Sequence, residues 1–137
     1  MMYALDTNII SYLLRGNENV LDSFEREIIQ AGNSFVIPPL VVYELRRWLH
    51  DNPTPSLIIF AKGFDALYQS VRSHTVMLAN SWEKAAEIYI MLKQKGQLIE
   101  EADILIAAYC MVNDYVLVTN NMRHFERING LKHVNWC

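Results

Sequence analysis

Short apolar runs alternate with longer stretches of helical periodicity along the chain. The first run, Tyr3-Ala4-Leu5, is too short for a helix and stops at Asp6, which predicts a buried strand that leads into a helix. Further strands are predicted at residues 34–37, 75–78 and 115–119, with a weaker edge strand at 131–136. Helices are predicted at residues 8–15, about 20–32, 39–50, 56–71, 80–96 and 98–113, with Gly and Pro at several of their ends and a capping box at residues 80–83.

This alternation predicts an α/β fold with a mainly parallel central sheet and helices on both faces, in the manner of a three-layer α/β/α sandwich. The length of 137 residues fits a single domain, residues 1–137. Residues 39–71 are predicted to form a helical hairpin that is partly appended to the sheet. We expect this helical arm to serve as a dimer or partner surface.

Composition narrows the class of protein. Apolar residues make up 52% of the chain, which argues against disorder, yet no run approaches the roughly 18 uninterrupted apolar residues of a membrane span. The start of the sequence lacks the pattern of a secretion signal, so we expect a cytoplasmic protein with no membrane partner. Cys110 and Cys137 are predicted to be free thiols, and the formal net charge of -3 does not by itself indicate nucleic-acid binding.

Asp103 is the least ordinary acidic residue in the sequence. Its neighbours on a helical wheel are Ile99, Ile106, Ala107 and Cys110, so the carboxylate lies on an apolar stripe. A buried and unpaired carboxylate costs several kcal/mol, so Asp103 is expected to have a cation, hydrogen bonds or a bound proton.

Two other acids have settings that admit more than one interpretation. Asp6 follows the first strand, at the sheet edge where open α/β sheets bind ligands, and helix N-capping is its simplest non-catalytic role. Glu44 lies between Leu40 and Trp48 on its helix, but Arg47 could pair with it at the surface. Structural roles therefore remain open for both residues.

Three oxygen donors from separate segments, without the His and Cys spacing of zinc sites, suit a hard cation such as Mg²⁺ or Mn²⁺. A cation held in this way can activate water against a phosphodiester, which is nuclease chemistry. A phosphatase or phospho-receiver would also place an aspartate at a strand end, but the former typically needs a second acid where Asn8 stands. A non-catalytic interaction module is the second alternative.

Several motifs, taken together and in order, resemble a known family. They are Leu5-Asp6-Thr7-Asn8 with Tyr12-Leu13-Leu14-Arg15, Glu44 on its helix, Gly96 through Asp103-Ile104-Leu105-Ile106-Ala107-Ala108, and Val118-Thr119-Asn120-Asn121 with His124-Phe125. The set resembles the PIN domain and, more narrowly, the VapC-type toxins, which are the ribonuclease halves of bacterial toxin–antitoxin pairs. The resemblance runs nearly from end to end.

The resemblance implies an α/β/α fold, Mg²⁺- or Mn²⁺-dependent cleavage of RNA, with tRNA as a candidate substrate, a homodimer, and an antitoxin whose basic side chain enters the acidic pocket. It implies that Asp6, Glu44 and Asp103 are the metal ligands. Many PIN domains have a fourth acidic residue where Asn120-Asn121 stands here, so Asn121 is expected to act through a water. The resemblance also suggests that Thr7 and Thr119 orient carboxylates or metal waters. We further expect Arg15 to contact a phosphate and His124 to be a surface or capping residue.

Overall fold

Four parallel strands form the centre of the molecule. The computed structural model describes residues 1–137, with strands β1 (Met2–Leu5), β2 (Ser34–Val36), β3 (Val116–Val118) and β4 (His133–Val134) in the order β2-β1-β3-β4. Strand β1 is central: Tyr3 pairs with Phe35 on one side and with Val116 on the other. The carboxyl end of β1, where Asp6 follows, is therefore flanked by the ends of β2 and β3.

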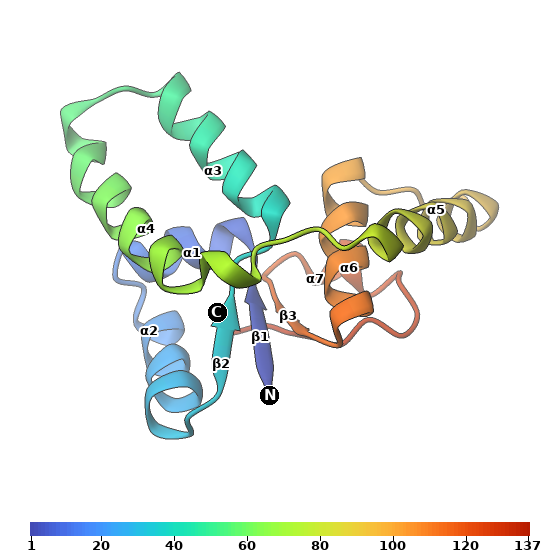
Figure 1. Cartoon of the computed structure of the whole chain (residues 1–137), viewed down its shortest axis with the longest axis horizontal. Helices are drawn as coiled ribbons and strands as arrows, with labels where there is room; N and C mark the ends of the chain where they lie inside the picture. The colour runs from blue at the N-terminus through green and yellow to red at the C-terminus, as the bar shows by residue number, and fades with distance from the viewer.

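Helices cover both sides of the sheet, as the alternation of the sequence predicts (Figure 1). The α-helices are α1 (Thr7–Leu14), α2 (Glu18–Phe24), α3 (Pro39–Asp51), α4 (Ile58–Val71), α5 (Ala79–Gln94), α6 (Glu101–Asn113) and α7 (Met122–Phe125). A π-helix, Glu25–Gln30, continues α2, and 3₁₀ turns at Pro55–Leu57 and Arg72–His74 flank α4. None of these helices combines the length and the apolar composition that crossing a bilayer requires.

The hydrophobic core joins the sheet to its helices. It contains 28 buried residues, among them Leu5 and Leu117 from the strands and Ile9, Ile106 and Phe125 from the helices, all with no exposed side-chain surface. The buried faces of α1 and α6 fix the two helices that begin beside the carboxyl ends of the strands. Both cysteines are free thiols, as predicted: Cys110 lies in this core and Cys137 lies at the surface.

The predicted helical arm is present as α3 and α4, which project together from the sheet in Figure 1. Pro39 occupies the first turn of α3, where its missing N–H leaves no bond unmade. The start of α4 exposes two apolar side chains: Ile58 is 53% exposed and Ile59 is 83% exposed.

The prediction of a strand at residues 75–78 is wrong. This segment is irregular chain between the 3₁₀ turn at Arg72–His74 and α5, and none of the sheet's strands pairs with it. The apolar run is not a core strand, because Val76 and Leu78 are exposed while Thr75 and Met77 are only partly buried. The predicted capping box at residues 80–83 is also wrong, since α5 begins at Ala79 with no side-chain cap, and the helix predicted from 98 begins at Glu101.

Candidate functional site

Asp6 lies between the end of β1 and the first turn of α1. Its Oδ1 accepts a 2.8 Å hydrogen bond from the Thr7 backbone N–H, so it is the helix N-cap, and its Oδ2 accepts a 2.7 Å bond from the Thr119 hydroxyl. The residue is only 6% exposed. Burial raises the pKa of Asp6 above its usual range; the two hydrogen bonds oppose that shift, and the charge of Asp103 adds to it. The capping role and a role in the site are therefore compatible.

Thr119 connects the ends of β1 and β3. It is fully buried directly after β3, and besides donating to Asp6 its Oγ1 accepts a 2.9 Å bond from the Asn121 backbone N–H. The Asp6 N–H in turn donates to the Val118 carbonyl at 3.0 Å. These bonds fix the loop after β3 against the loop after β1.

Glu44 approaches the same place from α3. Its Oε1 accepts a 2.9 Å bond from the Thr7 hydroxyl, and burial followed by the charges of Asp6 and Asp103 raises its pKa. The alternative of a surface ion pair is not what the structure contains, because the Arg47 guanidinium lies over the Tyr43 ring at 5.1 Å and forms no salt bridge with Glu44. The charge of Arg47 lowers the pKa of Glu44, but it has the smallest effect among the groups that shift this pKa.

Asp103 lies in the first turn of α6, with 15% of its side chain exposed. Its Oδ2 is 2.9 Å from His124 Nδ1 and 3.5 Å from Asn121 Nδ2. Both contacts come from the segment after β3. Asp103 is therefore a partnered acid on a helix face that is otherwise apolar.

The three carboxylates converge without forming a closed cage. Asp103 raises the pKa of Asp6, and both of them raise the pKa of Glu44, so the three charges act on one another. No three His, Cys, Asp or Glu side chains are close enough together to hold an ion in this arrangement. Mg²⁺ is commonly held by one or two carboxylates and keeps several waters, so the chemistry of this donor set fits a hard cation.

A chain of amides borders the carboxylates. Asn8 Nδ2 donates to Asn120 Oδ1 at 3.2 Å, and Asn120 Nδ2 donates to the Tyr12 hydroxyl at 3.2 Å. Beside it is a hollow of about 170 Å³ between α1 and α3, lined by Thr7, Asn8, Ser11, Leu45 and Trp48. The predicted phosphate contact Arg15 lies at the far end of α1, 5.6 Å above the Trp48 ring, so cation–π packing occupies its guanidinium.

Sequence reasoning missed two neighbours of the predicted site residues. His124 was predicted to be a surface or capping residue but contacts Asp103, and Tyr12 receives the amide chain. The spacing of three residues between Asn121 and His124 at the start of α7 is the signal that could have identified His124, because helical residues three apart share a face.

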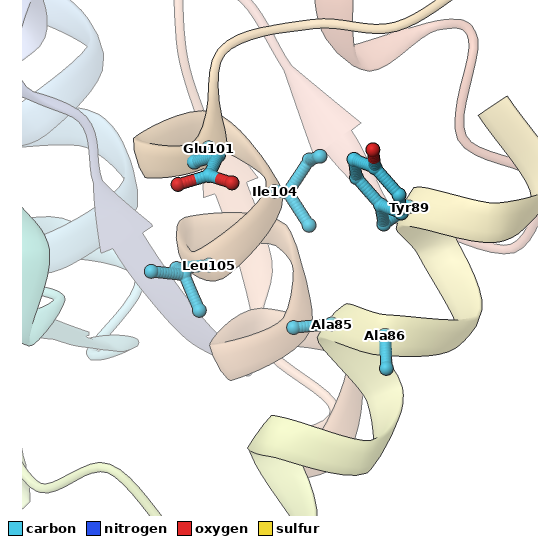
Figure 2. Close-up of a pocket in the computed structure, with 6 residues that line it drawn as sticks. All are labelled: Ala85, Ala86, Tyr89, Glu101, Ile104 and Leu105. Carbon is cyan, nitrogen blue, oxygen red and sulfur yellow. The ribbon is translucent and has the colours of Figure 1, made fainter. Parts of the chain in front are cut away.

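A second hollow, of about 230 Å³, lies between α5 and α6. Figure 2 shows its lining of Ala85, Ala86, Tyr89, Glu101, Ile104 and Leu105, of which only Glu101 is charged. Glu101 is exposed, and its position two residues from Asp103 places it on another face of α6. None of the three converging carboxylates lines this hollow.

Known proteins resemble the chain over its whole length. A family model described as PIN domain matches residues 3–131. The chain is 30% identical over 140 residues to Ribonuclease VapC2 of Haemophilus influenzae, covering 99% of this chain and 98% of that protein. It is 25% identical over 138 residues to the tRNA(fMet)-specific endonuclease VapC of Salmonella typhimurium, covering 100% and 99%.

Among solved structures, that of VapBC2 from Rickettsia felis bound to a DNA fragment from their promoter aligns over 100% of both chains, with 26% identity and a TM-score of 0.83. Three observations point to the same family. They are the parallel sheet, the motifs that contain Asp6 and Thr119, and the full-length matches. The chain belongs to the PIN domain family and, within it, is of the VapC type.

Proposed function

We propose that this protein is an endoribonuclease that depends on a divalent metal and acts as the toxin of a toxin–antitoxin pair. The observation that carries the proposal is the chain of hydrogen bonds that links the three acids: Thr7 bonds both Asp6 and Glu44, and Thr119 connects Asp6, through Asn121, to Asp103. Keeping three acids together costs folding free energy, because burial and mutual repulsion disfavour their charged forms. A bound cation would offset that cost.

Asp6, Glu44 and Asp103 are the proposed ligands of Mg²⁺ or Mn²⁺. The cation, when bound, would supply an activated water and neutralise charge on a phosphodiester. Thr7 orients two of the ligands, since its N–H holds Asp6 and its hydroxyl holds Glu44. Thr119 holds the second oxygen of Asp6 and positions Asn121, an uncharged amide beside Asp103.

RNA is the proposed substrate, and tRNA is the first class to test. The relatives bear the names of ribonucleases, and the one from Salmonella typhimurium is named for tRNA(fMet). The hollow beside Thr7 and Asn8 offers a polar and aromatic surface next to the carboxylates. A single-stranded nucleotide stacks on such surfaces.

Two protein partners belong to the proposal. The Rickettsia felis structure is that of a VapBC2 complex, which supports an antitoxin for this chain as well. We propose that a basic side chain of the antitoxin enters the acidic pocket, where Arg or Lys can neutralise the carboxylates. We also propose a homodimer that uses the arm of α3 and α4.

The experiment is cleavage of an RNA panel that includes tRNA by the purified chain, free of antitoxin, with Mn²⁺, with Mg²⁺ and with EDTA. Cleavage should require the metal, and Asp103→Asn should reduce its rate by at least about a hundredfold, since it removes a ligand charge while keeping the side-chain shape. The matched control is Asp114→Asn at an exposed acid that pairs with Lys132. Asp114 has φ 56°, a conformation that Asn tolerates well.

Equal activity of wild type and Asp103→Asn would contradict the proposed site. No cleavage of any RNA by the wild type, with either metal, would favour the alternative of a PIN-fold interaction module with weak or no catalysis. The uncharged Asn121 beside Asp103 is the feature that favours this alternative.

A further inference from the structure

His124 and Asn121 form a cluster on one oxygen of Asp103. His124 Nδ1 and Asn121 Nδ2 lie 2.9 Å and 3.5 Å from Oδ2, and 2.9 Å from each other. An ionised carboxylate oxygen only accepts hydrogen bonds, so His124 donates to Oδ2 in the tautomer that carries its hydrogen on Nδ1, and in that tautomer Nδ1 does not accept from Asn121 Nδ2. The structure has no hydrogen bond from either nitrogen to Oδ1.

The base of this cluster is rigid. His124 lies on α7, whose neighbouring Phe125 is fully buried in the core. Asn121 precedes α7, and its N–H is bonded to the Oγ1 of the fully buried Thr119. The imidazole of His124 is 32% exposed, but the backbone that carries it is held by Asn121 on one side and by Phe125 on the other.

We propose that His124 is a positioning residue for metal binding: it holds Oδ2 of Asp103 and leaves Oδ1 as the oxygen available to a cation. This inference rests on the proposed function. A carboxylate that keeps one oxygen on a protein donor presents the other in one direction, and loss of such supporting contacts typically weakens metal affinity about 10- to 100-fold. Asn121 alone, at 3.5 Å, is too distant to give the same constraint.

The opposite role for His124 makes a different prediction. If the imidazole occupied Asp103 in place of the cation, its removal would free a ligand and tighten metal binding. The position of Nδ1 argues for support instead, because both nitrogen contacts converge on Oδ2 and leave Oδ1 without a protein donor.

The test measures Mn²⁺ binding to the full chain by isothermal titration calorimetry, without RNA. His124→Leu should raise the Mn²⁺ dissociation constant by about tenfold or more. His124→Asn should retain most of the affinity, since the amide nitrogen of Asn can take the place of Nδ1. His133→Leu is the matched control. His133 is also partly buried, but it begins β4 and its Nδ1 contacts the Leu131 carbonyl before that strand, whereas the site lies at the carboxyl ends of the strands.

Cleavage as a function of Mn²⁺ concentration gives a second readout. The Mn²⁺ concentration for half-maximal rate should rise in His124→Leu, while the rate at saturating Mn²⁺ falls by a smaller factor. Should His124→Leu fail to fold, His124→Gln provides the same test, because its amide reaches the Nε2 position and not the Nδ1 position.

Unchanged or tighter Mn²⁺ binding by the folded His124→Leu variant would overturn the inference, as would equal losses in His124→Asn and His124→Leu. Asp6→Asn separates this failure from failure of the proposed function. If Asp6→Asn weakens Mn²⁺ binding and His124→Leu does not, only the role of His124 is wrong. If the wild type binds no Mn²⁺, both proposals are wrong.

Discussion

At the scale of single residues, Asp6 combines a structural bond with an electrostatic cost. It caps α1 and joins the loops after β1 and β3, but it is only 6% exposed and lies near Asp103. Burial is the main reason that its pKa is raised, and hydrogen bonds from Thr119 and Thr7 recover only part of the cost. The folded state therefore holds a proton on Asp6 more tightly than the unfolded state does.

This difference predicts how stability depends on pH. As pH rises from the ordinary value of 3.8 through the raised pKa of folded Asp6, the wild type loses stability, because charge develops more easily on the unfolded chain. Asp6→Asn has no such titration. The free energy of unfolding of the variant minus that of the wild type should therefore increase across this window and then level off.

Urea unfolding in EDTA at a series of pH values measures this difference. Asp65→Asn serves as control, since Asp65 is an exposed acid that pairs with Arg46 on the arm. A difference between Asp6→Asn and wild type that stays flat or shrinks with rising pH would show that burial of the Asp6 charge does not cost stability.

The carboxylates could be predicted from sequence, whereas the spacing of His124 from Asn121 indicates only a shared helix face and not the contact of His124 with Asp103. An acid among apolar positions, as at Asp103, contradicts the local pattern and thereby marks itself. The contact of His124 with Asp103 joins residues 21 positions apart and depends on how α7 packs beside α6. Periodicity along one helix carries no information on that packing.

At the scale of elements, Gly63 allows α4 to pack closely on α1. Sequence alone makes Gly63 a weak point inside a helix, since Gly costs about 1 kcal/mol relative to Ala there. In the structure a Cβ added at Gly63 would lie 2.9 Å from Leu14 Cδ2. The missing side chain is thus part of the contact between the arm and the body of the molecule.

Substitutions at Gly63 should therefore show a steep dependence on size. Gly63→Ala should change the free energy of unfolding by less than about 1 kcal/mol, because the gain in helix propensity offsets a small shift of the Leu14 methyl group. Gly63→Leu should destabilise by about 1–3 kcal/mol through overpacking. Ala66→Leu, at an exposed position of α4, is the control, and equal effects of the two Leu variants in urea unfolding would contradict the packing argument.

Elements were predictable where the local pattern also decides the tertiary contact. The short apolar run before Asp6 predicts a buried strand, and Pro39 is well placed in the first turn of a helix; the structure contains both. Residues 75–78 form a short apolar run like that of a strand, but strand formation needs a partner edge, which no local pattern reveals. Ser81 fits a cap by type, yet it lies inside α5 with a buried hydroxyl that has no hydrogen-bond partner.

At the scale of the whole molecule, the arm presents apolar side chains that the core does not cover. Ile58 and Ile59 are 53% and 83% exposed near the start of α4. Large apolar side chains left exposed together indicate an interface. The proposed homodimer needs such an interface, and we therefore assign Ile58 and Ile59 to the contact with a second copy of the chain.

Ile59→Glu should then weaken self-association by at least about tenfold, since a charge would replace an apolar contact at the interface. Sedimentation velocity over a concentration series measures this change. Ile29→Glu is the matched control, because Ile29 is 68% exposed on the π-helix at a distance along the chain from the arm. A monomeric wild type, or equal behaviour of the two variants, would contradict the assignment.

The bond between Asp6 and Thr119 joins residues 113 positions apart. The bond can form only when the loop after β1 and the loop after β3 lie against each other, so neither half of the fold holds Asp6 in place without the other. Any change that loosens the pairing of β1 with β3 should therefore disturb the proposed centre, even when it alters none of the acidic residues.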